Sequence, residues 1–168
     1  MSTRSQNETK FSHWEDLPGG GRRYWIDVEG RQGWRARYLK EVDAAELTLR
    51  FWQEIYDEQG KLAEVHHKLP VDEGHRKAYD GAMTITRQAV ADRIADYLHH
   101  RITQAQLVDW AETALMDGEF DGKDAATLSA VVARLGVADV RAFGLAWADC
   151  EELLGRLGFA ARVEIVTT

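Results

Sequence analysis

The sequence has little cysteine, little proline and no long apolar run. Its one cysteine, Cys150, cannot form a disulfide within the chain. It stands near Leu153 and Leu154 in an expected helix, which indicates a small buried side chain rather than a reactive thiol. No segment has the apolar length of a signal peptide core or a membrane span. We therefore expect a cytoplasmic protein with no membrane partner.

Motifs of several enzyme classes are missing as well. Neither GxGxxG nor the Walker pattern occurs, and Gly19–Gly21 precedes an expected strand rather than a helix. Ser129 falls inside an expected helix, so no nucleophile elbow is present. The zinc pattern HExxH is absent too. These absences exclude the common nucleotide-binding and serine-hydrolase sites, and we expect no cofactor and no metal.

Charge is distributed unequally along the chain. The net charge is −7, with 13 Lys and Arg against 14 Asp and Glu in residues 1–78, and 8 against 14 in residues 79–168. A net charge of −6 in the second half disfavours a nucleic-acid surface, which needs clustered cations. It is compatible with a basic protein partner.

The first half alternates between apolar and polar residues, the pattern of strands. Residues 1–21 are polar, end in a glycine run and are expected to form a flexible leader. Strands are expected at residues 22–29, 34–42, 47–56 and 61–69, joined by short turns. Short connections favour an antiparallel four-stranded meander.

The second half shows helical spacing. Thr103 followed by Gln106 matches a capping box, and Leu107, Trp110, Ala111, Ala114 and Leu115 follow at helical intervals. Other helices are expected from Thr84 or Thr86 to about His100, from Asp124 to Leu135, and over residues 147–157. Residues 159–166 alternate again and predict a short final strand.

The predicted sheet carries its arginines and several aromatic residues on one face. Alternation places these side chains opposite the Tyr38 and Phe51 side. Arginine and tryptophan are the commonest anchors of protein interfaces. The residues predicted to bind a partner are Trp25, Arg35, Arg37, Arg50 and Trp52.

Histidines, carboxylates and cations gather in residues 66–77 at the end of the fourth expected strand. Such a group can supply an acid, a base and a phosphate-binding cation, which a metal-independent endoribonuclease requires. The candidate catalytic residues of this alternative are His67, Lys68, His75 and Arg76. The other interpretation is a solvated strand end capped by Asp72. A metal held by His66 or His67 with His75 and Asp72 would match no standard zinc spacing.

Two parts of the chain resemble known bacterial families. The segments 33–38 and 51–57 with His75 and Arg76 resemble small proteins of toxin–antitoxin loci, and their sheet is similar to RelE-like toxins. The segments 101–111 and 151–158 resemble helical immunity or antitoxin-like proteins of bacterial conflict systems. RelE-like toxins are typically basic and begin with a helix pair before the sheet, whereas this chain is acidic and is expected to begin with strands.

Taken together, these patterns predict an α+β fold: a leader over residues 1–21, an antiparallel sheet domain over 22–77 and a helical domain over 78–168. The favoured function is non-enzymatic binding of a protein partner, of antitoxin, immunity or inhibitor type. The alternatives are a metal-independent endoribonuclease or an accessory subunit of a larger bacterial complex. A homodimer through the sheet remains open.

Overall fold

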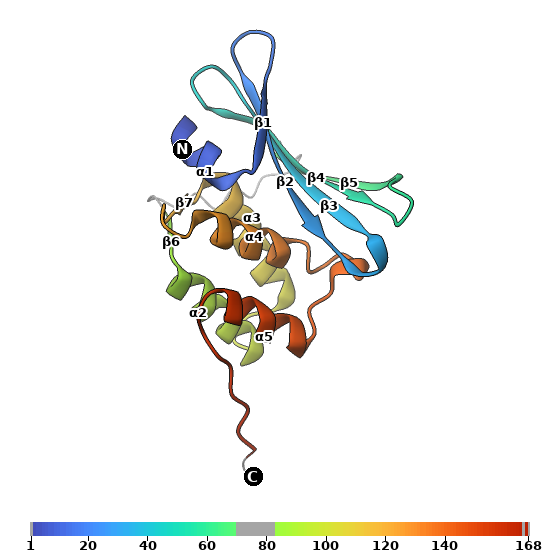
Figure 1. The fold of residues 1–168 in the computed structure, drawn as a ribbon, viewed down its shortest axis with the longest axis vertical. Helices are drawn as coiled ribbons and strands as arrows, with labels where there is room; N and C mark the ends of the chain where they lie inside the picture. The colour runs from blue at the N-terminus through green and yellow to red at the C-terminus, as the bar shows by residue number, and fades with distance from the viewer. Residues whose placement is uncertain (1, 70–82, 166, 168) are drawn as a thin grey trace.

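The computed structural model describes residues 2–69, 83–165 and 167, in which an antiparallel sheet lies against a group of helices (Figure 1). The five strands of the sheet follow one another in sequence order, each antiparallel to its neighbour. This arrangement confirms the predicted α+β class. The strands are β1 (His13–Asp16), β2 (Arg22–Glu29), β3 (Arg35–Val42), β4 (Thr48–Tyr56) and β5 (Leu62–Leu69).

Residues 4–16 are helix and strand, so the predicted flexible leader is wrong and the four-stranded meander has a fifth strand. Helix α1 (Arg4–Lys10) begins at a capping box, in which Thr3 and Gln6 bond each other's backbone. The buried residues Asn7, Lys10 and Phe11 fix this helix against the rest of the fold. Composition missed it because two of these three side chains are polar and are buried only with specific hydrogen-bond partners.

The helices of the second half begin close to the expected caps. Thr86 and Thr103 each accept a hydrogen bond from the helix backbone, and Gln106 completes the predicted capping box. A two-stranded parallel ladder joins the segments before α2 and after α3. The elements are β6 (Thr84–Ile85), α2 (Arg87–Leu98), α3 (Gln104–Asp117), β7 (Glu119–Phe120), α4 (Ala125–Gly136) and α5 (Trp147–Arg156), with 3₁₀ turns η1 (Arg31–Gly33) and η2 (Arg141–Phe143).

Sheet and helices share one apolar core. Tyr24, Tyr38 and Ile55 of the sheet belong to the same buried cluster as Leu107 and Val132 of the helices. The expected sheet domain and helical domain are therefore two layers of one packed unit. Among the described helices, none is long and apolar enough to cross a membrane.

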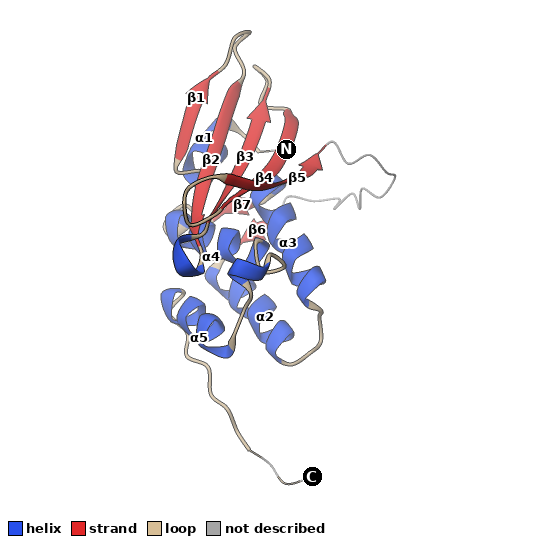
Figure 2. Ribbon diagram, turned by 90° about the vertical axis from the view of Figure 1, so that its right-hand side faces the viewer, coloured by secondary structure: helices blue, strands red, loops and turns tan. Residues whose placement is uncertain are grey.

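The predicted final strand does not form in the described residues. Phe159 and Ala161 pack against the core, but the segment through Ile165 has no strand assignment. The alternating pattern is present, but no strand of the described residues lies beside this segment, because it leaves the body of the molecule at the end far from the sheet (Figures 1 and 2).

Candidate interaction surface on the sheet

One face of the sheet, here called the outer face, points away from the helices (Figures 1 and 2). The strand register aligns Trp25 with Leu39, and Leu39 with Trp52, across β2, β3 and β4. Alternation then adds Arg35, Arg37 and Arg50 to this face. All five residues predicted to bind a partner therefore lie together on the outer face. The face consists of His13, Glu15, Arg23, Trp25, Asp27, Glu29, Arg35, Arg37, Leu39, Glu41, Arg50, Trp52, Glu54, Tyr56, Leu62, Val65 and His67.

Arginines stack on the aromatic rings of the outer face. The guanidinium carbons lie 4.6, 5.1 and 5.7 Å from the ring centroids in the pairs Arg50–Trp52, Arg35–Tyr56 and Arg37–Trp25. Each cation–π contact contributes about 0.5–1 kcal/mol at an exposed site. The stacks also explain why Trp52 is only 6% exposed on a face without covering helices.

Several carboxylates of the outer face already have donors within the chain. Asp27 accepts two hydrogen bonds from Arg37, at 2.7 and 3.1 Å. Glu41 accepts from Arg23 at 2.6 and 2.9 Å. Glu54 accepts from the Trp52 indole nitrogen at 3.0 Å and from the Tyr56 hydroxyl. Asp27, Glu41 and Glu54 are consequently satisfied without a partner.

Two arginines of the outer face keep free donors. Arg50 reaches Glu41 only at 3.4 Å, and Arg35 has no carboxylate partner among the described residues. Both side chains are exposed. The N–H groups of an exposed guanidinium can bind a carboxylate with two hydrogen bonds.

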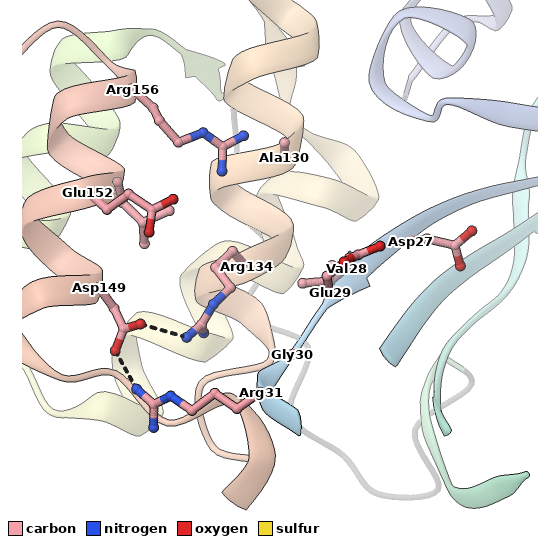
Figure 3. A pocket seen from close by; sticks show the side chains of 11 residues that line it. Asp27, Val28, Glu29, Gly30, Arg31, Ala130, Arg134, Asp149, Glu152 and Arg156 are labelled. Carbon is pink, nitrogen blue, oxygen red and sulfur yellow. Dashed lines mark hydrogen bonds and ion pairs between the residues drawn. The ribbon is translucent and has the colours of Figure 1, made fainter. Parts of the chain in front are cut away.

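A groove of about 380 Å³ lies between the end of β2 and helices α4 and α5 (Figure 3). Arg31 donates to Asp149 at 2.6 Å from one side of it. Arg134 lies 3.6 Å from the same carboxylate and donates to the Phe143 and Gly144 carbonyl oxygens. Burial lowers the pKa of Arg134. The contacts of Arg31 and Arg134 therefore join the end of β2 to helices α4 and α5.

A polar cluster on the inner face ties β5 to α3. Lys68 lies 2.8 Å from Glu112, whose carboxylate also accepts from the Tyr38 hydroxyl at 3.3 Å. Burial raises the pKa of Glu112, against the opposing effect of Lys68. Gln53, fully buried on the same face, has no hydrogen-bond partner for its side-chain amide among the described residues.

A β-bulge separates the residues of the endoribonuclease alternative. Phe51 pairs with Leu69 while the next residue, Trp52, pairs with His67, so Lys68 stands in the bulge. His67 lies on the outer face with Trp52, whereas Lys68 bonds Glu112 on the inner side. The structure therefore does not bring these two candidates together. His75 and Arg76, like Asp72 and the rest of that segment, lie outside the described residues.

Two buried lysines, Lys10 of α1 and Lys40 of β3, were not anticipated from the sequence. Lys40 donates to Asn7 Oδ1 at 3.0 Å and to the Met116 carbonyl at 2.6 Å. Lys10 donates to the Gly118 carbonyl at 2.8 Å. Both therefore cap the C-terminal end of α3, where carbonyl oxygens lack helix partners. The alternation of β3 did place Lys40 on the inner face, which was the available signal.

No match was found when the chain was compared with protein-family models, with curated proteins and with solved structures. Within the described residues, no group of three or more His, Cys, Asp or Glu side chains is arranged to hold a metal ion. The case for a function therefore depends on the geometry of the outer face.

Proposed function

We propose that this chain is a non-enzymatic protein-binding module of the antitoxin, immunity or inhibitor type, and that the outer face binds its partner. The observation that supports this proposal is the set of three arginine–aromatic contacts on one sheet face, which none of the described helices covers. Stacked rings are rigid and lose little conformational entropy on binding. Arginine and tryptophan also contribute most often to binding free energy at interfaces.

The free donors of Arg35 and Arg50 indicate carboxylates on the partner. An acidic side chain that reaches either guanidinium gains charge-assisted hydrogen bonds without displacing an internal ion pair. Basic side chains at the same place would have to compete with Arg37 and Arg23 for Asp27 and Glu41. The contact itself therefore favours Asp or Glu of the partner.

Net charge imposes a second condition on the partner. The chain carries −7, which speeds encounter with a protein of positive net charge and slows encounter with an acidic one. A basic protein that presents one acidic segment to the outer face satisfies both conditions. This combination gives the expected partner: positive overall, with Asp or Glu at the contact.

The test uses the products of the neighbouring genes as candidate partners, co-expressed and purified with this chain. Calorimetry should show that Arg35→Ala and Arg50→Ala each weaken binding at least tenfold, about 1.4 kcal/mol. The matched controls are Arg101→Ala and Trp147→Ala, whose exposed side chains lie on the helical part. They should bind within twofold of the wild type.

Two results would count against this function. Sheet variants that bind as tightly as the wild type would remove the outer face from the interaction. Cleavage of RNA by the purified chain, lost in Lys68→Ala, would instead favour the endoribonuclease alternative.

A further inference from the structure

The C-terminal segment Ala161–Ile165 has the pattern of a strand but no neighbouring strand in the part of the chain that the structure describes. Val163 and Ile165 alternate with Arg162 and Glu164, and they are 67% and 95% exposed. The last backbone hydrogen bond to the body is donated by Phe159, among the described residues. An extended segment with β-branched side chains and free backbone groups is suited to pairing with a sheet edge.

Strand β1 provides such an edge. It lies at the outside of the sheet and pairs only with β2 among the described residues. All four of its residues are exposed, and Trp14 retains 44% of its accessible surface. The side of β1 away from β2 therefore offers unpaired N–H and C=O groups to another strand.

The two segments are complementary in one orientation. An antiparallel register with Val163 opposite Trp14 places Arg162 opposite Glu15 and Glu164 opposite His13. The result is one apolar pair, Val163 with Trp14, flanked on each side by a pair of a hydrogen-bond donor and an acceptor. Such cross-strand pairs stabilise a sheet. A parallel register would instead place Glu164 opposite Glu15 and Arg162 opposite His13, which is unfavourable. The side chains thus select the antiparallel arrangement.

The segment and β1 lie at opposite ends of one molecule. In both ribbon views the C-terminal segment leaves α5 at the helical end and extends away from the sheet (Figures 1 and 2). Its apolar stripe begins with Phe159 and Ala161 packed on the core and continues into solvent. The β1 edge that this stripe can reach is therefore that of a second copy.

We propose that Ala161–Ile165 of one copy pairs antiparallel with β1 of a second copy, and that the exchange is reciprocal. Each sheet then gains a sixth strand, and the two-fold arrangement closes without further growth. The exchange leaves the stacks of the outer face in place. It thus adds a dimer to the binding module without depending on how that module binds its partner.

Light scattering after size exclusion, together with sedimentation equilibrium of the full chain, tests the exchange. The wild type should be a dimer, whereas Val163→Asp and Arg162→Glu should each raise the dimer dissociation constant at least tenfold. The control Thr167→Asp places a charge in the same segment beyond the paired residues and should leave the dimer unchanged.

Three outcomes would overturn the exchange. The first is a wild type that stays monomeric at 100 µM. The second is a dimer that survives both Val163→Asp and Arg162→Glu. The third is a monomer whose Val163 and Ile165 amides are protected from hydrogen exchange, because the segment would then pair within its own chain.

Discussion

The buried Lys40 predicts an unusual dependence of stability on pH. Burial lowers its pKa from 10.5 to about 8, although Asp117 and Glu46 oppose the shift. One pKa unit corresponds to about 1.4 kcal/mol, so holding this lysine charged and buried costs the fold about 3 kcal/mol near neutral pH. Burial and the nearby Lys40 ammonium also lower the pKa of Lys10. The two lysines therefore act in the same direction.

The sign follows from the protons bound by each state. Between about pH 8 and 10.5 the unfolded chain keeps a proton on Lys40 that the folded chain has lost, so the free energy of unfolding rises with pH. From pH 7 to 9.5 this linkage amounts to roughly 2 kcal/mol for Lys40 alone. Tyr24, whose pKa burial raises to about 12, lowers stability only above its ordinary value of 10. The pH range in which the titration of Lys40 can be measured without that of Tyr24 therefore ends near pH 9.5.

Urea unfolding followed by tryptophan fluorescence at pH 7 and pH 9.5 measures the effect. The wild type should gain about 2 kcal/mol more between the two pH values than Lys40→Met, which has no titrating group at this position. The control Lys123→Met removes an exposed lysine and should follow the wild type. If wild type and Lys40→Met change equally, the ammonium of Lys40 is not destabilised by burial and the reasoning fails.

Three further predictions concern two glycines, a helix cap and the buried carboxylate of Glu112. Gly136→Ala would place a Cβ 2.5 Å from the Tyr38 hydroxyl and should lower the free energy of unfolding by about 1–3 kcal/mol. The Cβ of Gly155→Ala in α5 meets no atom within 4 Å, so this variant should raise the free energy of unfolding by about 0.4–1 kcal/mol. Chemical denaturation compares the two variants. Thr103→Ala removes the N-cap of α3 and should cost about 1 kcal/mol in the same assay. In the wild type, the free energy of unfolding should fall as pH rises from 4.5 through the raised pKa of Glu112. Glu112→Gln should abolish this fall, as measured by unfolding in acidic buffers.

Alternation and capping patterns were enough to predict most helices and strands, because both patterns depend on residues close together in the sequence. The strands β2 to β5 follow apolar residues that recur at every second position, and burial of Tyr24, Tyr38 and Ile55 enforces that register. The start of α3 was predicted because the capping box of Thr103 and Gln106 is a contact between residues close in sequence.

The remaining features depend on contacts between residues far apart in sequence. Lys10 bonds the Gly118 carbonyl, which lies 108 positions away, so its burial could not be read from a polar leader. The β-bulge at Lys68 places this residue on the inner side together with Leu69, although alternation would put these neighbours on opposite faces, and bulges have no short sequence signature here. The outer face was predictable because side chains on one face of a strand recur at every second residue.

The stabilising contacts and the proposed binding surface lie on opposite sides of the same strands. In β3, Tyr38 and Lys40 bond groups of α3 on the inner side, while Arg35 and Arg37 stack on rings of the outer side. Removing an exposed guanidinium such as that of Arg35 leaves every inner hydrogen bond intact. Arg35 and Arg50 can therefore be changed with little effect on the free energy of unfolding, about 0.5–1 kcal/mol for each lost stack. Loss of binding in a stably folded Arg35 variant would thus report on the surface rather than on the fold.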